Sequence, residues 1–228
     1  MWRRASTWVE EAAAVFAKEW RCELRTRYAL NTLALFAFTT LVIVSVALGP
    51  LGIALAQGTT VLPVLLWLIL LFAAAAGLPR AFVHEEETQT ATALRLAARP
   101  STLFCGKLAY GLVLVLALEA IVAPLYLAVM SLGVARPADF VAALAAGGFG
   151  LAAGSTLVAA IIAQARGQGT LFAVLSFPIL LPLLLLAVEL TRNAVAGTPP
   201  GMALEQLLLY DAVITAAGLM LFPSVWNP

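Results

Sequence analysis

The sequence predicts an all-α, polytopic membrane protein with six transmembrane helices and an N-terminal amphipathic helix at the membrane interface. Hydrophobic residues make up 63% of the 228 residues, whereas soluble domains contain about 45–50%. Charged residues make up only 11%, and the mean hydropathy is +1.00. Six apolar runs are each long enough to cross the hydrocarbon core, which takes about 20 residues. Lipid is therefore the expected solvent for most of the chain.

The same composition excludes several classes of protein. So few charged residues cannot build a water-exposed surface, which excludes a soluble enzyme, and disordered chains are polar rather than apolar. A net charge of +1 argues against a nucleic-acid binder, which needs a basic stripe. The single histidine, His84, excludes a multi-histidine metal site, so we expect no metal. Cys22 and Cys105 both fall on the predicted cytoplasmic side, where a disulfide is not expected.

The spans leave room only for short connections, so we expect one membrane domain over residues 29–228 behind an N-terminal helix over residues 1–28. The predicted spans are residues 29–48, 60–78, 108–132, 140–163, 170–188 and 204–222. Basic residues gather on one side of these spans, and only Arg136 and Arg192 fall on the other. This bias places both termini in the cytoplasm. A cleaved signal peptide is not expected, because the stretch before residue 29 is long and acidic residues interrupt it.

Residues 7–27 predict an amphipathic helix. Thr7 and Glu10 match a capping box, in which each side chain satisfies a free backbone N–H at the helix start. Apolar residues recur at helical spacing on one face, namely Val9, Ala13, Phe16, Trp20 and Leu24. Such a helix lies in the plane of the interface. Two roles stay open for it, a membrane anchor and an elbow that also contacts a cytoplasmic partner.

The segment 80–107, between the second and third spans, is too long for a simple turn. Glu85 and Glu86 lie near its start, and Arg95 and Arg99 follow. Acidic residues at the start and basic residues at the end match a helix macrodipole. We therefore predict a short helix across the cytoplasmic mouth with a charged outward face, and these four residues are the candidate docking element. The alternative is a solvated loop that only satisfies the topology.

Two acidic residues fall inside predicted spans, where a charge is costly. Glu119 lies near the middle of the third span and Asp211 in the outer part of the sixth. Such residues line a substrate path, take part in a proton-linked step, or fix packing through an interhelical hydrogen bond. No lysine or arginine lies deep enough to pair with Glu119, and for this residue we favour the interhelical hydrogen bond.

Small residues and prolines mark the fourth and fifth spans. Gly150 and Gly154 form a small-xxx-small pair, which suits close packing within the chain as well as dimerisation. Pro178 and Pro182 each remove a backbone hydrogen bond and predict a kink or break in the fifth span. Such a bend is either a hinge or static.

Catalysis by this chain is not expected. Ser155 follows a glycine, but the only histidine that could activate it is predicted to be cytoplasmic. The sequence contains no H-E-x-x-H zinc motif and no G-x-x-x-x-G-K-[ST] phosphate loop. Any ATP hydrolysis is therefore expected on a separate subunit.

Four segments, taken in chain order, are similar to those of one known family. They are Phe82, Glu85 or Glu86, Leu94, Pro100, Gly106 and Lys107 in the loop, then residues 119–124, then Phe177 and Pro178 with Pro182, and finally Tyr210 and Asp211 with the tail to Trp226. On these residues the chain resembles the haem exporter protein B (CcmB) family over nearly its full length. It departs from the family pattern in residues 88–93, where an expected glycine is absent.

The resemblance implies a permease subunit of the ABC-2 type, or type V exporter, in the bacterial inner membrane. It implies a homodimer that docks a separate CcmA-like ATPase through the first cytoplasmic loop, together with CcmC-like and CcmD-like membrane subunits. Haem is the implied cargo, delivered for cytochrome c biogenesis, and ATP binds to the partner subunit. Two alternatives stay open: a small ion- or proton-coupled transporter unrelated to ABC systems, and a membrane scaffold that does not transport.

Overall fold

The computed structural model describes residues 7–56, 60–79, 85, 98–163 and 168–226, and within these residues it contains helices and no strand. The helices are α1 (Trp8–Thr26), α2 (Tyr28–Ala56), α3 (Val61–Gly77), α6 (Pro100–Val129), α7 (Pro137–Ala163), α8 (Gln168–Ala196) and α9 (Ala203–Trp226). Five of them are long and apolar enough to cross a membrane, whereas α3 has 17 residues and is shorter. The all-α polytopic class is confirmed, and the count of six spans stays a prediction.

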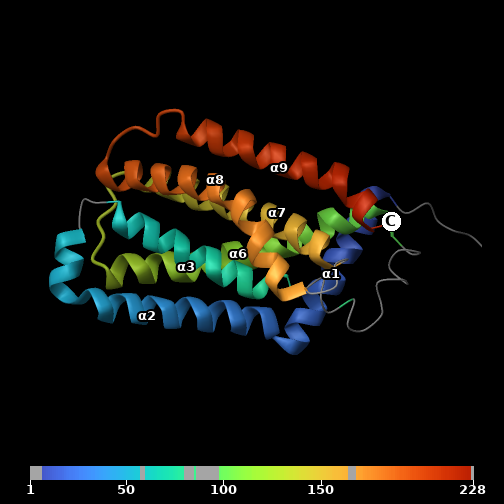
Figure 1. Ribbon diagram of the computed structural model, residues 1–228, viewed down its shortest axis with the longest axis horizontal. Helices are drawn as coiled ribbons and strands as arrows, with labels where there is room; N and C mark the ends of the chain where they lie inside the picture. The colour runs from blue at the N-terminus through green and yellow to red at the C-terminus, as the bar shows by residue number, and fades with distance from the viewer. Residues whose placement is uncertain (1–6, 57–59, 80–84, 86–97, 164–167, 227–228) are drawn as a thin grey trace, which may run out of the picture.

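Helices α2, α3, α6, α7, α8 and α9 run along the long axis of the molecule, and α1 packs against α6 (Figure 1). Helix α1 lies at one end of the bundle, and the C-terminal end of α9 lies at the same end. The connection from α8 to α9 and that from α6 to α7 lie at the opposite end. This arrangement agrees with a topology in which both ends of the chain share one side. That this side is the cytoplasm stays a prediction.

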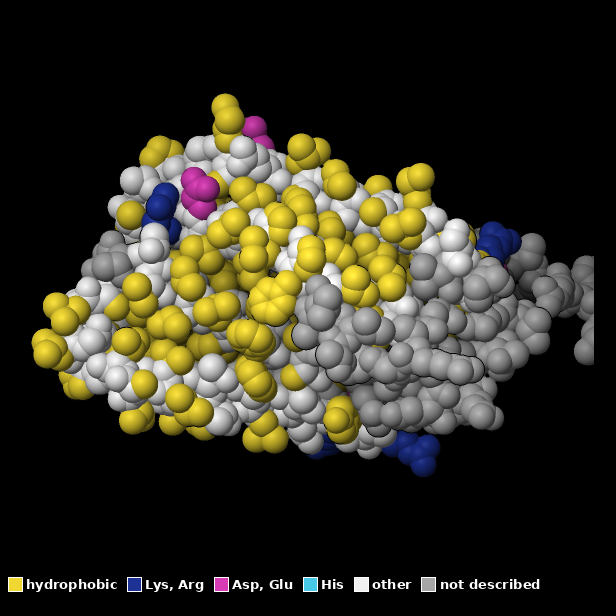
Figure 2. Space-filling view, in the orientation of Figure 1, with side chains coloured by type: hydrophobic (Ala, Val, Ile, Leu, Met, Phe, Trp, Pro, Cys, Tyr) yellow, Lys and Arg dark blue, Asp and Glu magenta, His cyan; other side chains and the backbone are white. Residues whose placement is uncertain are grey.

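The outer surface of the bundle is apolar. Hydrophobic side chains cover much of the described part of the face in Figure 2, and charged ones are few. Helix α2 contributes strongly, since Leu35, Phe38, Ile43 and Val46 are exposed along it. Soluble monomers rarely expose a contiguous apolar surface that extends along a whole helix. Lipid contact explains it.

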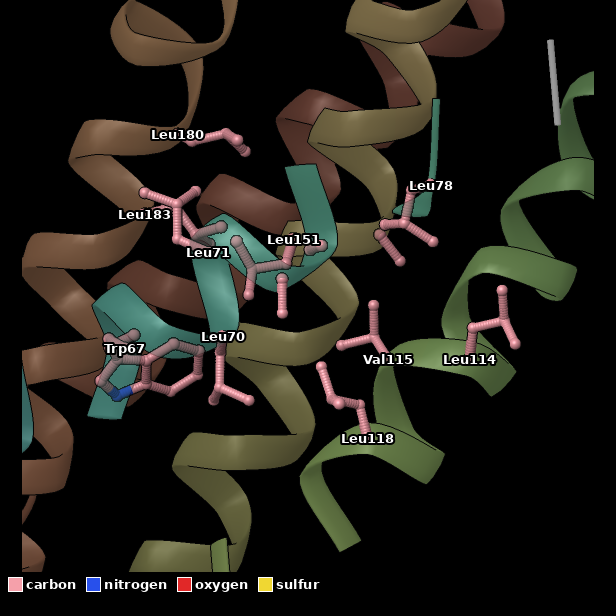
Figure 3. Close-up of a cluster of buried hydrophobic side chains, with 14 of the residues drawn as sticks. Trp67, Leu70, Leu71, Leu78, Leu114, Val115, Leu118, Leu151, Leu180 and Leu183 are labelled. Atoms are coloured by element: carbon pink, nitrogen blue, oxygen red, sulfur yellow. The ribbon is translucent and has the colours of Figure 1, made fainter. Parts of the chain in front are cut away.

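Helix α7 is the central helix of the bundle. Buried residues make up 83% of its most apolar stretch, against 17% in α2, and α7 packs against α3, α6, α8 and α9. Figure 3 shows Leu151 of α7 among side chains that come from α3, α6 and α8. A helix that is apolar all round is the kind that a bundle buries.

Helix α2 breaks near its end. Gly49 has φ 61° and ψ 177°, a conformation outside the helix, and Pro50 follows it. Glycine adopts positive φ without a Cβ clash, and proline suits the first turn of a new helical segment. The predicted first span, which ends at residue 48, therefore stops where the regular helix does.

Helix α1 confirms the predicted capping box, and the face that it buries against α6 is not its predicted apolar face. Thr7 and Glu10 cap each other's backbone, as the sequence indicates. The fully buried residues of α1, however, are Val15, Glu19 and Glu23, spaced four apart. Two members of the predicted apolar face, Val9 and Leu24, are exposed. The reason is that α1 packs this largely acidic stripe against basic and hydroxyl groups of α6.

Candidate functional site

Four charged residues meet where α1 lies on α6, and we call them the ion cluster: Lys18 and Glu19 of α1, Glu85, and Lys107 of α6. The Lys107 Nζ lies 2.9 Å from Glu19 Oε1 and 3.0 Å from Glu85 Oε1. The Lys18 Nζ lies 3.0 Å from Glu19 Oε1 and also pairs with Glu85. Two lysines thus share two carboxylates, and the net charge of the cluster is zero.

The two lysines differ in burial. The side chain of Lys107 is 1% exposed, whereas that of Lys18 is 43% exposed. Glu85 is buried at 2% exposure. Removing one partner of a buried ion pair leaves an uncompensated charge, while an exposed pair contributes little. Lys107 is therefore the residue on which the cluster depends.

The charges of the cluster shift the pKa values of its α1 members. Burial alone would raise the pKa of the Glu19 carboxyl, but Lys107 and Lys18 outweigh it and hold that pKa below its usual value. Burial would likewise lower the pKa of Lys18, but Glu19 and Glu85 outweigh it and raise that pKa. Both shifts favour the charged forms, so the pairs persist at neutral pH.

These shifts predict a pH window for the docking of α1. The contribution of Glu19 is present above the pKa of an unfolded glutamate, about 4.3, and is lost as the pH falls through its lowered folded value. The contribution of Lys18 is present below about 10.4 and is lost as the pH rises through its raised value. We expect a spin label on Cys22 to stay immobile between these limits and to gain mobility in acid, with Cys105 replaced by serine.

The matched control for this titration is Glu19→Gln, which should show the mobile signal already at neutral pH. A label that stays immobile in acid until the whole bundle unfolds would contradict the assignment.

Two further features hold α1 on α6. Gly106 has no room for a side chain, because a Cβ there would lie 2.6 Å from the Val15 Cβ and 2.8 Å from the Ala12 carbonyl oxygen. Glu23 accepts hydrogen bonds from the Tyr110 hydroxyl, at 3.0 Å, and from the Leu30 backbone N–H, at 2.8 Å. Gly106 sets the close approach of the helices, and Glu23 links α1, α2 and α6.

Inside the bundle, two acidic residues lie against glycines of α7. A Cβ at Gly148 would lie 2.6 Å from Glu119 Oε1, and one at Gly150 would lie 2.3 Å from Asp211 Oδ1. Both acids are buried, and neither carboxyl group has a hydrogen-bond partner among the described residues. The interhelical hydrogen bond that we favoured for Glu119 is therefore not found in the described part of the chain. Glycine makes room for each carboxyl group but offers it no side-chain donor.

Other glycines of α7 receive apolar side chains. A Cβ at Gly147 would lie 2.0 Å from the ring of Trp67 in α3, and one at Gly154 would lie 2.5 Å from Leu180 in α8. Gly150 also contacts α8, through Leu183. The predicted pair Gly150 and Gly154 thus serves packing within the chain. Together with Gly147 and Gly148 these residues form what we call the α7 glycine face.

The prolines of α8 do not end the helix. Helix α8 continues from Gln168 to Ala196 through Pro178 and Pro182, so the predicted break is absent, and a kink stays a prediction. Beside them, the Tyr210 hydroxyl of α9 donates a hydrogen bond to the Ile179 carbonyl. A proline weakens the helical hydrogen bonds of the preceding turn, so an outside donor stabilises this part of α8.

Comparison with known protein families decides to which family the chain belongs. The family model described as CcmB protein matches residues 10–224, nearly the whole chain. The chain belongs to the CcmB family. Membership makes it a multi-pass membrane protein and implies a haem-exporter ABC permease role in cytochrome c biogenesis. The comparison with curated proteins finds no match.

The structure gives physical roles to residues on which the resemblance to the CcmB family rests. Gly106 lets α1 approach α6 closely. Lys107 forms an ion pair with Glu19 of α1. Tyr210 and Asp211 contact α8 and α7 from α9. The Glu119 side chain of α6 packs against Gly148 of α7, the central helix. These family residues therefore hold helices together in this chain, and none forms a catalytic constellation with its described neighbours.

The predicted docking residues of this CcmB-family chain have different positions. Glu85 was expected on a charged outward face, but the ion cluster buries it, so its side chain is not free for a direct contact with a partner. Arg99 is 63% exposed, precedes α6 as its N-cap residue, and lies 3.8 Å from Glu11. Glu86 and Arg95 lie outside the described residues. For these three residues, partner contact stays a prediction.

Sequence reasoning overlooked Lys107 and Glu19 as a site. The signal was available in the spacing of Val15, Glu19 and Glu23, because residues four apart share one face of a helix. Two acids on the same face as a buried valine predict a buried cation opposite them. Lys107, inside an otherwise apolar stretch, is that cation.

Proposed function

We propose that this chain is the permease subunit of an ABC-type haem exporter in cytochrome c maturation, and that a separate ATPase subunit drives it. The match to the CcmB family over residues 10–224 is the observation that carries this proposal. The apolar outer surface and the long apolar helices support it. In the proposed complex the chain forms a homodimer with a CcmA-like ATPase and with CcmC-like and CcmD-like subunits, in the inner membrane, and haem is the cargo.

The ATPase acts on the segment 80–107 in this proposal. Residue 85 lies within that segment, and its buried ion pairs with Lys107 and Lys18 join it to α6 and α1. Force applied to the segment therefore moves α1 and α6 as one unit. Such coupling has an effect only if ATP-driven docking favours one state of the helices over another.

From α6 the movement reaches the centre of the bundle. Glu119 of α6 lies directly on Gly148 of α7, and α7 contacts α3, α8 and α9. A shift of α6 therefore changes the packing of the helix that α3, α8 and α9 also contact. Because α6 and α7 are closely packed, a shift of α6 is transmitted to α7 rather than taken up by empty space between them.

The direct test is association of the ATPase with charge-reversed variants. We expect Glu86→Lys combined with Arg99→Glu to lower co-purification of the ATPase in mild detergent about tenfold, which corresponds to about 1.4 kcal/mol. Glu85 is left unchanged because its reversal would also disrupt the ion cluster. The matched control is Arg192→Glu, an exposed arginine near the end of α8, which should co-purify the ATPase at wild-type yield.

Wild-type co-purification by the double variant would contradict docking through this segment. Transport by the purified chain in liposomes without any ATPase would contradict the permease proposal itself and favour an ion-coupled transporter.

A further inference from the structure

The C-terminal half of α1 carries three exposed arginines, which we call the arginine group. Arg21 and Arg25 belong to α1, and Arg27 is the C-cap residue that follows it. None of them forms an ion pair with a described residue. Arg21 and Arg25 lie about one turn apart, where like charges repel each other. An anion from outside the described chain relieves this repulsion.

The acidic residues of α1 do not pair with the arginine group. Glu19 lies in the middle of the stripe that α1 buries against α6, and at about 100° per residue Arg21 lies about 200° and Arg25 about 240° around the helix from it. These two arginines therefore lie on the side of α1 that faces away from α6. The other acids have partners of their own: Glu10 caps the helix start, Glu11 lies 3.8 Å from Arg99, and Glu23 accepts a hydrogen bond from Tyr110.

An apolar side chain lies beside the arginines on this outer side. Leu24 is about 140° around the helix from Glu19, next to Arg21, and it is exposed. Tyr28, which follows Arg27, is exposed as well. Apolar and basic side chains side by side are typical of a helix in the membrane interface, where the apolar ones reach the acyl chains and the basic ones stay among the headgroups.

The connection to α2 places the arginine group at the membrane surface. Arg27 is the only residue between α1 and α2, and α1 turns away from the line of α2 there (Figure 1). The regular part of α2 runs from Tyr28 to the break at Gly49, about 30 Å at 1.5 Å per residue, which equals the thickness of the hydrocarbon core. Tyr28 therefore lies at the edge of the core, and the arginines before it lie among the headgroups.

We propose that the arginine group binds the headgroups of anionic phospholipids, such as phosphatidylglycerol, in the leaflet at this end of the bundle. Guanidinium groups donate paired hydrogen bonds to phosphate oxygens, and an anionic leaflet attracts basic residues at its surface. Leu24 adds contact with the acyl chains. The lipid thereby holds α1 on the side opposite its contact with α6. This interaction surface goes beyond the proposed permease role and does not depend on the ATPase.

Fluorescence quenching by brominated lipids tests the proposal on the full chain. A fluorophore is attached at Leu24→Cys, with Cys22 and Cys105 replaced by serine, and the protein is placed in nanodiscs of phosphatidylcholine and phosphatidylglycerol in equal amounts. Bromine is carried by the acyl chains of one lipid or of the other. We expect quenching that corresponds to an enrichment of phosphatidylglycerol beside α1 of about fivefold or more, and this preference should weaken at high salt.

The matched control for the position is the same fluorophore at Val46→Cys, on the lipid-facing side of α2. There the two brominated lipids should quench equally, because the neighbouring exposed side chains of α2 are apolar.

Charge variants then decide whether the arginines cause the preference. Arg21→Gln combined with Arg25→Gln should lower the enrichment close to the level at Val46. Arg21→Lys combined with Arg25→Lys should retain most of it, which separates loss of charge from misfolding. Arg27 is left unchanged because its φ of 52° belongs to the cap of α1. Arg192→Gln, at the opposite end of the bundle, should leave the enrichment unchanged.

Four results would overturn the proposal. The first two are equal quenching by the two lipids at residue 24 and a preference that the glutamine pair leaves intact. The third is a preference that inorganic phosphate abolishes when sodium chloride of the same ionic strength does not, which would assign the arginines to free phosphate. The fourth is a preference that disappears when the ATPase binds, which would assign them to a protein partner.

Discussion

Replacing Lys107 by alanine is expected to release α1 from α6 and to destabilise the protein by about 3–5 kcal/mol. The reason is that Glu19 and Glu85 both pair with this buried lysine, and its removal leaves carboxylates in a site closed to water. Thermal unfolding in detergent measures the loss of stability. Proteolysis at Arg21 and Arg25 of α1 reports the release, because an undocked α1 is cut faster.

Lys18→Ala is the matched control. Lys18 pairs with the same two carboxylates, but its side chain is 43% exposed, so we expect a loss below about 1 kcal/mol. Equal losses for the two lysines would show that burial does not set the importance of the pairs. A Lys107→Met, Glu19→Gln, Glu85→Gln triple variant should recover much of the stability, because it removes the buried charges together.

Much of the fold follows from the sequence because lipid imposes a simple rule. A run of about 20 apolar residues must be helical to satisfy its backbone hydrogen bonds. The residues that end the elements are equally local: Thr7 and Glu10 begin α1, and the break at Gly49 and Pro50 follows the predicted end of the first span.

What the sequence could not predict is which helices share a contact. The periodicity of α1 points to its apolar face, yet Glu19 and Glu23 are buried along with Val15, because Lys107 and Tyr110 of α6 lie opposite these acids. That partnership joins residues more than 80 positions apart. Glu85 was expected on the outward face because charged side chains are mostly exposed unless they are paired. The sequence alone did not indicate its pairing with Lys107, which buries it.

The α7 glycine face shows the same limit. Gly150 and Gly154 are recognisable as a small-residue pair, but the sequence does not say that α8 fills the space beside them. Gly147, which lies outside the pair, accommodates the side chain of Trp67, one of the largest that is fully buried.

Gly147→Ala is expected to force α3 away from α7, at a cost of about 1–3 kcal/mol. The added Cβ would lie 2.0 Å from the Trp67 ring, which is 1% exposed. The ring cannot turn aside easily, since its Nε1 donates a hydrogen bond of 2.8 Å to Thr191 of α8. The added methyl group must therefore separate helices rather than rotate one side chain. Thermal unfolding in detergent measures the change, and the difference in tryptophan fluorescence between the variant and the original chain reports the altered surroundings of Trp67.

Gly111→Ala in α6 separates this steric effect from the general effect of replacing a helical glycine. Its Cβ would have no neighbour closer than 3.5 Å, an ordinary contact, and alanine favours the helix by up to about 1 kcal/mol. We therefore expect the Gly111 variant to be neutral or slightly stabilised while the Gly147 variant is destabilised. If both variants behaved alike, close approach at Gly147 would not be what fixes α3 against α7. Movement from α6 would then lack its proposed rigid route through the central helix to α3.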